Sequence, residues 1–268
     1  MTRLVADDVA EPERRLRQLD HSLLAVAELD LRALALSAAG QAPTGDALGE
    51  ALVAAVPMTS GEGPISGFCP AVAAILRHLG CKAWVTEDAD VSGIHEATQA
   101  GAEVLFLADD ARFVALNVRR GRCVDNDLAT ADGYVAALEA AAGGLGGRSA
   151  LLLGLGPVGR AAARRLLARG ADVAVVEPDE DRLRASLTEA PALRPVSLAE
   201  GLERCALILD ATPVPDIIDV DDVGPTTVAA VPGLPSGFTA RAQSALGAGH
   251  IHDPLVIGVA VMGARALG

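Results

Sequence analysis

The chain has 268 residues, of which 35 are acidic and 22 basic, so its formal net charge is −13. This acidic excess repels phosphate backbones and anionic lipid headgroups, which argues against nucleic acid or a membrane surface as a partner. Hydrophobic residues make up 51% of the chain and aromatic residues only 2%, a composition too apolar for disorder. The length favours one large domain or two modest domains.

Targeting features are absent from the sequence pattern. No apolar run reaches the roughly 18 residues of a membrane-spanning helix, and residues 1–13 lack the apolar core of a secretion signal. Four cysteines without a C-x-x-C pair are typical of free thiols in a reducing compartment, so we expect a cytoplasmic protein. Lys82 is the only lysine and therefore the only candidate for a catalytic lysine.

The first half of the chain predicts an α/β arrangement. Leucines and valines at three- and four-residue spacing predict a helix within residues 11–38, followed by a break at residues 40–46. Strands and helices then alternate, which predicts a mostly parallel sheet. The expected strands are 53–57, 83–86, 103–108 and 113–118, and the expected helices are 70–79 and 94–99.

A second alternating run follows a glycine-rich hinge at residues 143–147. Its expected strands are 150–153, 173–176, 207–209 and 228–231, and the expected helices are 133–142, 161–168 and 255–267. The predicted fold class is therefore α/β, with an N-terminal α/β substrate domain (1–131) and a C-terminal Rossmann-type dinucleotide-binding domain (145–254). We expect helices 132–142 and 255–268 to pack between these domains.

The most informative motif is the run Gly154-Leu155-Gly156-Pro157-Val158-Gly159, which follows an apolar strand and opens a helix. The first glycine permits a tight turn, the second lets a pyrophosphate approach the backbone, and the third allows close packing of helix on strand. The N–H groups of the helix N-terminus favour phosphates. This pattern predicts a dinucleotide site. The alternative is a glycine turn in a fold that binds nothing or binds S-adenosylmethionine.

Glu177 ends the next expected strand, 18 residues after Gly159. A carboxylate there can accept hydrogen bonds from the adenosine ribose and would repel a 2′-phosphate, which favours NAD over NADP as the cofactor. Two later turns also follow strands and are expected to border the nicotinamide-side ribose. Their candidate residues are Ala211, Thr212, Pro213 and Pro232, although each turn could equally be a plain connection.

Polar clusters follow three of the strands expected in the first domain. They are residues 59–63, residues 88–93 and the pair Asp109-Asp110, and they should converge at one edge of the sheet. Carboxylates there suit a small substrate with free amines, because either aspartate could bind an ammonium group or accept a proton from an amine. The alternative for the pair is a solvated turn that caps the next helix.

Two other patterns carry less chemistry. His250 and His252 alternate like a metal-binding pair, but with no matching third ligand we expect a structural role and no metal. Residues 126–134, before the Rossmann domain, resemble shikimate and methylenetetrahydrofolate dehydrogenases, which depend on active-site lysines. Lys82 starts a strand, at the wrong end for the site, and this weakens both of those hypotheses.

Several motifs occur together in one order along the chain. In the first domain they are the segments 57–63, 67–68, 90–93, 96–97 and 108–110. In the second half they are the fingerprint 154–159 and the segments 211–213, 232–235 and 254–258. Together, and in this order, they resemble one family, the pyrroline-closing dehydrogenases of pyrrolysine biosynthesis, known as pyrrolysine synthases. The resemblance covers nearly the whole chain.

The resemblance implies NAD-dependent oxidation of the terminal amine carbon of lysine-Nε-3-methyl-D-ornithine to an imine and semialdehyde. Ring closure to pyrrolysine, with loss of ammonia and water, would follow. It also implies an N-terminal lid helix with Leu4 at the substrate, Phe68 as a pocket aromatic, Ser60 in a substrate-binding loop and Asp109 as the catalytic carboxylate that holds the amine. The alternatives are a dehydrogenase of another amino-acid or diamine derivative and a non-catalytic NAD-binding regulator. The last helix is a candidate homodimer interface.

Overall fold

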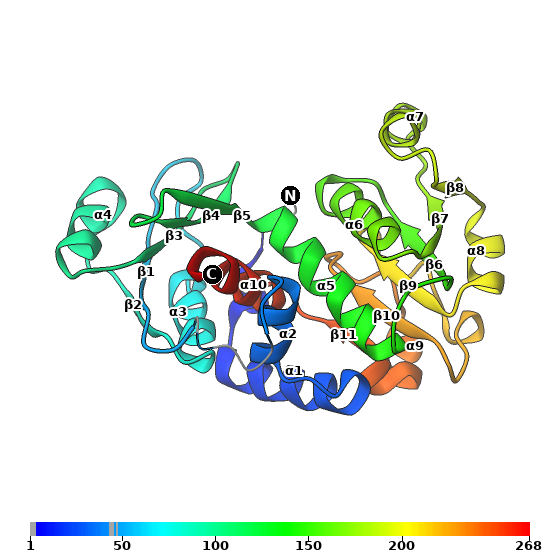
Figure 1. Cartoon of the computed structure of the whole chain (residues 1–268), viewed down its shortest axis with the longest axis horizontal. Helices are drawn as coiled ribbons and strands as arrows, with labels where there is room; N and C mark the ends of the chain where they lie inside the picture. Colours follow the sequence, from blue (N-terminus) through cyan, green and yellow to red (C-terminus); the bar gives the residue numbers. More distant parts are fainter. Residues whose placement is uncertain (1–3, 43–45, 47) are drawn as a thin grey trace. The chain divides into compact units, whose positions relative to one another are not determined.

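Two β-sheets organise the chain (Figure 1). The computed structural model describes residues 4–42, 46 and 48–268. Contacts between residues divide the chain into two units. Unit 1 includes the C-terminal segment of the chain, and unit 2 includes a short segment from near the N-terminus. Unit 1 comprises Met1–Gln18, Leu31–Thr130 and Leu255–Gly268, and unit 2 comprises Leu19–Asp30 and Ala131–Pro254. Among the residues described, no helix is both long and apolar enough to cross a membrane.

Unit 1 contains a five-stranded sheet in the order β2-β1-β3-β4-β5. The strands are β1 (Leu52–Val56), β2 (Lys82–Val85), β3 (Val104–Ala108), β4 (Phe113–Asn117) and β5 (Arg122–Asp125). β1 pairs in parallel with β2 and β3, whereas β4 pairs antiparallel with β3 and β5. The prediction of parallel pairing is therefore wrong for β4, and β5 was not among the expected strands. Only residues 109–112 separate β3 from β4, whereas a parallel crossover needs about a dozen residues.

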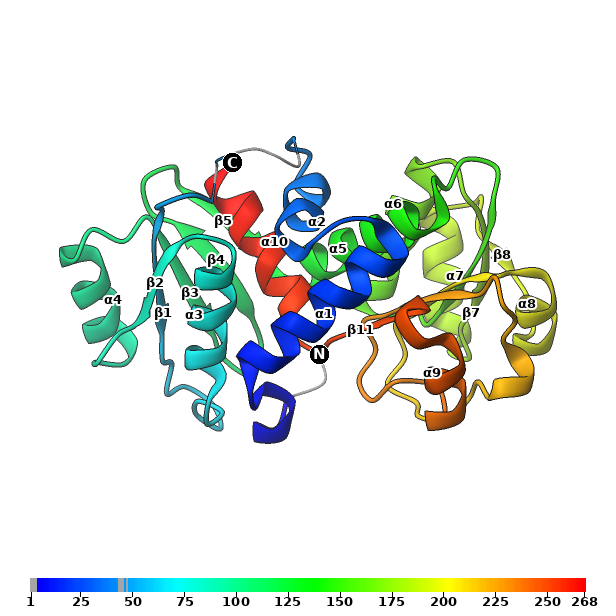
Figure 2. The same cartoon turned by 90° about the horizontal axis from the view of Figure 1, so that it is seen from below.

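Helices pack on both faces of this sheet, namely α3 (Phe68–His78), α4 (Asp90–Gln99) and α10 (Val256–Leu267). The unit also contains η1 (Ala6–Val9), which contacts α3, α1 (Pro12–Ala27, which continues into unit 2) and α2 (Leu31–Ala38), which packs on α10. Ala97 of α4 packs on Ala54 and Val56 of β1, and α3 and α10 lie on the opposite face (Figure 2). The single helix expected within 11–38 is two helices, because Glu28 adopts a left-handed φ of 56° between them.

Unit 2 contains a six-stranded, all-parallel sheet in the order β11-β10-β9-β6-β7-β8. The strands are β6 (Ser149–Leu153), β7 (Asp172–Val176), β8 (Arg194–Pro195), β9 (Leu207–Asp210), β10 (Val228–Val231) and β11 (His250–His252). The chain leaves β6 in one direction through β7 and β8 and returns on its other side through β9. This reversal between β6 and β9 creates the crevice in which open α/β sheets bind ligands.

The helices of unit 2 begin where local chemistry favours a start. They are α5 (Asn126–Ala142, which begins in unit 1), α6 (Pro157–Ala168), α7 (Glu180–Glu189), α8 (Leu198–Arg204) and α9 (Ala240–Leu246), with short turns η2 (Val220–Asp222) and η3 (Gly247–Gly249). α5 starts seven residues earlier than expected because the Asp125 carboxylate accepts the Asp127 N–H at 2.9 Å. α6 starts at Pro157, whose fixed φ suits the first helical position.

Candidate functional site

The loops that follow β1, β2 and β3 are joined by carboxylates. The backbone N–H of Thr59 donates to Asp90 Oδ1 at 2.8 Å, and the Thr59 hydroxyl donates to the other oxygen. These bonds hold the pKa of Asp90 below its usual range, and the bond from the Thr59 hydroxyl has the largest effect. The backbone N–H of Glu62 donates to Asp110 Oδ2 at 2.7 Å. The predicted convergence of the three polar clusters at one edge of the sheet is therefore confirmed.

A pocket of about 290 Å³ lies at this edge of unit 1. Its lining residues are Leu4, Val56, Met58, Glu62, Gly63, Pro64, Ile65, Phe68, Cys69, Ala108, Asp109, Asp110 and Phe113. Three of the predicted substrate residues, Leu4, Phe68 and Asp109, are thus brought together. Ser60 is exposed and is not among the residues that line the pocket. Sequence reasoning missed Met58, because a single apolar side chain after a strand has no distinguishing pattern.

Asp109 stands at the polar rim of this pocket. Its Oδ1 accepts the backbone N–H of Arg112 at 2.7 Å and that of Ala111 at 2.8 Å. These two bonds hold the pKa of the exposed Asp109 carboxyl below its usual range, so it is negatively charged near neutral pH. The turn leads into β4, so the expectation that the Asp109-Asp110 pair caps a following helix is wrong.

The pocket is also lined by aromatic rings. Phe68 and Phe113 meet edge to face, with ring centroids 5.1 Å apart and planes at 70°, and the ring centroid of Phe106 lies 6.1 Å from that of Phe113. Edge-to-face packing of such rings is energetically favourable. The pocket therefore combines a charged carboxylate with an aromatic surface, which suits a molecule with an alkyl chain and an ammonium group.

The glycine fingerprint of unit 2 leaves room for a phosphate. Gly154 has a φ of 83°, which favours glycine. A Cβ atom on Gly159 would lie 2.0 Å from the Gly154 carbonyl oxygen, so this position requires glycine for helix–strand contact. A Cβ on Gly156 would meet nothing within 4 Å, and Gly156 is the N-cap of α6. The residues present therefore fit a dinucleotide pyrophosphate at the helix N-terminus.

Glu177 lies beneath this loop, with a side chain only 2% exposed. Its Oε2 accepts the Leu155 N–H at 2.7 Å and its Oε1 accepts the Asp179 N–H at 3.0 Å. Arg182 forms an ion pair with the same carboxylate at 3.3 Å. Glu177 thus holds the glycine loop in place. Its contact with a ribose stays a prediction.

The turn after β9 packs against the glycine loop. A Cβ on Gly154 would lie 3.1 Å from both the Ala211 carbonyl oxygen and the Thr212 methyl group. The turn after β10 packs against the turn after β9, because the Gly233 N–H donates to the Asp210 carbonyl at 2.9 Å. The three loops at the carboxyl ends of β6, β9 and β10 therefore form one continuous rim.

The other predicted cofactor residues lie on this rim. Pro157 is exposed and Val158 half-buried at the start of α6, while Pro213 is exposed and Pro232 half-buried in the two later turns. Their contacts with a cofactor stay predictions.

Both histidines of β11 have structural partners. His250 Nε2 lies 3.2 Å from Ser236 Oγ, and burial lowers the pKa of His250 to about 4. His252 Nδ1 lies 2.7 Å from the Val231 carbonyl oxygen. Within the described part of the chain, no three metal-binding side chains cluster.

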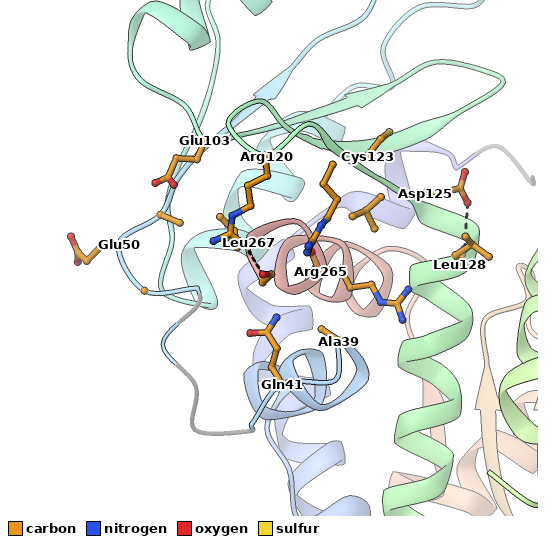
Figure 3. Close-up of a pocket in the computed structure, with 15 residues that line it drawn as sticks. Ala39, Gln41, Glu50, Glu103, Arg120, Cys123, Asp125, Leu128, Arg265 and Leu267 are labelled. Carbon is orange, nitrogen blue, oxygen red and sulfur yellow. Dashed lines mark hydrogen bonds between the residues drawn. The ribbon is translucent and has the colours of Figure 1, made fainter. Parts of the chain in front are cut away.

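A wider hollow of about 1070 Å³ lies at the opposite edge of the first sheet, where Glu50 and Glu103 precede β1 and β3 (Figure 3). Two of its arginines bind backbone carbonyl groups. Arg120 donates to the Gly268 carbonyl at 2.5 Å, and Arg122 donates to the Arg265 carbonyl at 2.8 Å. Arginines at these positions satisfy the last carbonyls of α10. The only lysine, Lys82, pairs with Glu50 at the same edge.

Comparisons with known proteins agree with this architecture. A family model described as "Pyrrolysine biosynthesis protein PylD, N-terminal domain" matches residues 8–124. A second model, described as "NADP oxidoreductase coenzyme F420-dependent", matches residues 149–225. A solved structure of quinate dehydrogenase from Corynebacterium glutamicum in complex with NAD has a TM-score of 0.50 at 15% identity, covering 81% of this chain and 94% of that chain. This likeness concerns the fold alone, and the predicted α/β class with a Rossmann-type second domain is confirmed.

Two relatives match along their full length. The chain is 29% identical over 262 residues to a pyrrolysine synthase of Methanosarcina acetivorans, covering 98% of each chain. It is 30% identical over 264 residues to a pyrrolysine synthase of Methanosarcina barkeri, covering 98% of this chain and 97% of the relative. The chain therefore belongs to the pyrrolysine synthase family of Rossmann-type oxidoreductases.

Proposed function

We propose that this protein catalyses the last step of pyrrolysine biosynthesis, the NAD-dependent oxidation and ring closure of lysine-Nε-3-methyl-D-ornithine. The observation that carries the proposal is the full-length relationship to two pyrrolysine synthases. The pocket of unit 1 supports it, because a charged carboxylate and an aromatic surface suit a substrate with free amines on a long alkyl chain.

The reaction has three steps on the substrate. The terminal amine carbon loses a hydride and a proton leaves the nitrogen, which gives an imine. Water adds to the imine and ammonia leaves, which gives a semialdehyde. The α-amine then condenses with the aldehyde, and water leaves as the ring C=N bond forms. Bound NAD⁺ would supply the hydride acceptor.

The chain's own residues would bind and orient the substrate. Asp109 would hold a substrate ammonium group at the rim of the pocket, since its carboxyl has a lowered pKa. The same low pKa makes Asp109 a weak base, so we assign it positioning of the amine. Phe68 and Leu4 would cover the alkyl chain and limit access of water. Ser60 would act from the loop that carries Glu62, although it does not line the pocket.

The cofactor would be held by the glycine loop, Glu177 and the turns 211–213 and 232–235. The charge of Glu177 beneath the loop supports NAD over NADP, because a 2′-phosphate would approach a buried carboxylate. Arg182 partly offsets that charge. Substitutions in the Glu177–Arg182 ion pair therefore test the preference for NAD over NADP.

One further expectation belongs to the proposal. All four cysteines are free thiols, and three of them are buried, which supports a reducing cytoplasm. The last helix is the candidate homodimer interface from the sequence, but every residue of α10 except Arg265 is buried within this chain, so the prediction of an interface on this helix is wrong.

Purified protein incubated with NAD⁺ and lysine-Nε-3-methyl-D-ornithine should form NADH and a pyrroline product with the mass expected after loss of two hydrogen atoms and ammonia. Asp109→Asn should raise the KM for substrate while NADH affinity stays unchanged, because the turn can persist without its charge. The full-length protein binding NADH but forming neither product would refute the proposed substrate. NADH formation with another diamine would instead support the alternative dehydrogenase.

A further inference from the structure

Asp210 is a buried carboxylate that no step of the proposed reaction uses. It ends β9 and is completely buried. Its Oδ1 accepts the Thr212 N–H at 3.0 Å and the Thr212 hydroxyl at 2.7 Å. Its Oδ2 accepts the Gly237 N–H at 2.8 Å. One carboxylate therefore binds two turns, the turn after β9 and the loop after β10.

We propose that Asp210 is a positioning residue that holds these two turns together and so fixes the nicotinamide half of the cofactor crevice. The inference rests on the proposed function, because that function is what places a dinucleotide in the crevice. It adds a role for a residue that contacts neither the glycine fingerprint nor the substrate pocket of unit 1.

The hydrogen-bond pattern requires a carboxylate. Both oxygens of Asp210 act as acceptors, and each faces donors from a different turn. An asparagine has one acceptor oxygen, so its NH₂ group would face either the Thr212 donors or the Gly237 N–H. A buried donor that faces another donor loses its hydrogen bond and costs stability at that turn. Asparagine can therefore hold one turn but not both.

The two turns pack closely at Asp210. A Cβ on Gly237 would lie 2.5 Å from Asp210 Oδ2, and a Cβ on Gly233 would lie 2.3 Å from the Thr212 carbonyl oxygen. Gly237 thus lets the backbone approach the carboxylate, and Gly233 lets the backbone of one turn approach that of the other.

The environment of Asp210 is unusual for a carboxylate. Burial raises its pKa, while hydrogen bonds from Thr212 and Gly237 and the nearby His252 oppose that shift. A buried acid of this kind is costly unless its acceptors are all used. Simple strand termination does not need it, since β9 already pairs with β6 and β10 through backbone bonds.

The test compares the binding of NADH with the binding of ADP-ribose in three variants. They are Asp210→Asn, the milder Thr212→Val, which removes only the hydroxyl bond, and the control Asp219→Asn. Asp219 is a matched control, because its carboxylate also bridges two segments of unit 2, accepting the Val220 N–H at 2.7 Å and the Thr239 hydroxyl at 2.7 Å. NADH binding by fluorescence reports the whole dinucleotide, and ADP-ribose binding by calorimetry reports the half without nicotinamide.

Asp210→Asn should weaken NADH binding by roughly tenfold to a hundredfold, the equivalent of one lost hydrogen bond to a buried charge. ADP-ribose affinity should stay unchanged. Thr212→Val should weaken NADH binding less, in the same direction, and Asp219→Asn should not weaken it. Equal losses for NADH and ADP-ribose, or wild-type NADH affinity, would overturn the proposal. If Asp210→Asn does not fold, the NADH and ADP-ribose affinities of Thr212→Val test the proposal in its place.

These measurements need no amine substrate, so the two proposals can fail separately. Wild-type protein that binds NADH but does not oxidise the lysine derivative refutes the proposed function and leaves the comparison of variants intact. Wild-type turnover together with an unaffected Asp210→Asn variant refutes the positioning role alone.

Discussion

Gly156 separates cofactor binding from folding more cleanly than any other position in the fingerprint. We expect Gly156→Ala to fold normally and to lose dinucleotide affinity. The residue has a φ of −64° and a ψ of −173°, which alanine adopts without strain. A Cβ there would meet nothing within 4 Å, whereas one on Gly159 would lie 2.0 Å from a backbone oxygen. The new methyl group would therefore occupy the space in which a pyrophosphate approaches the backbone.

The expected stability change is small because two terms oppose each other. Replacing glycine by alanine at a compatible position stabilises by about 0.4–1 kcal/mol through the unfolded chain. Alanine is a poorer helix N-cap than glycine, and this costs about 0.5–1 kcal/mol. The unfolding free energy should therefore change by less than about 1 kcal/mol. NADH affinity should fall at least about tenfold, which corresponds to ~1.4 kcal/mol of binding free energy.

The assay pairs urea unfolding with NADH titration. Gly224→Ala is the matched control, because Gly224 is an exposed loop glycine of unit 2 whose Cβ would also meet nothing within 4 Å. The control should keep both stability and NADH affinity. Wild-type NADH affinity in Gly156→Ala would refute the pyrophosphate site at this loop. A loss of NADH affinity together with a large loss of stability would refute the inference that a methyl group fits at Gly156 without disturbing the fold.

Three further changes test other parts of the second unit. Glu177→Gln should shift the ratio of kcat/KM values toward NADP⁺, because it removes a buried negative charge and leaves Asp179 as the carboxylate paired with Arg182, and an unchanged ratio would remove Glu177 from cofactor selection. The pKa of His250 is about 4 when folded and about 6.5 when unfolded. Unfolding free energy should therefore fall by up to about 1.4 kcal/mol per pH unit as pH drops from 6.5 to 4, and His250→Gln should flatten this slope. Arg165→Met should destabilise by about 3 kcal/mol in urea unfolding, because it leaves the buried carboxylate of Asp132 without its guanidinium partner; a change near zero would contradict this reasoning.

The sequence predicted those parts of the fold whose pattern is local. Apolar strands followed by glycine turns identify β6 and α6, and parallel strands necessarily bring their following loops to one edge. Features that depend on distant pairing were not predictable. β5 carries charged residues at both ends and exists because it pairs with β4, and β8 has only the two residues Arg194–Pro195. The short connection after Ala108 did contain the information for the antiparallel turn, through its length alone.

The same distinction between local patterns and distant contacts applies to the site residues. Asp109 and Phe68 were found through motifs that the family shares, and the structure places both at one pocket. Phe113 also lines this pocket, yet nothing near it in the sequence marks it as a site residue. Asp210 was equally hidden, because an aspartate at the end of a strand is usually solvated. Its burial depends on Gly237, which lies 27 residues further along the chain.

The contacts of the carboxylates at strand ends show that most of these acidic residues have a structural role. Charge alone suggested that such residues attract a cationic substrate, but most of them bind the backbone of a neighbouring loop. Asp90, Asp110 and Glu177 each accept a backbone N–H from the loop after another strand, and Asp210 does the same inside the second sheet. A carboxylate whose acceptors bind backbone is a poor trap for a substrate amine. In contrast, Asp109 accepts both of its backbone N–H groups through Oδ1 alone and from its own turn. Its other oxygen and its exposure at the pocket make Asp109 the expected binding site for the substrate ammonium group.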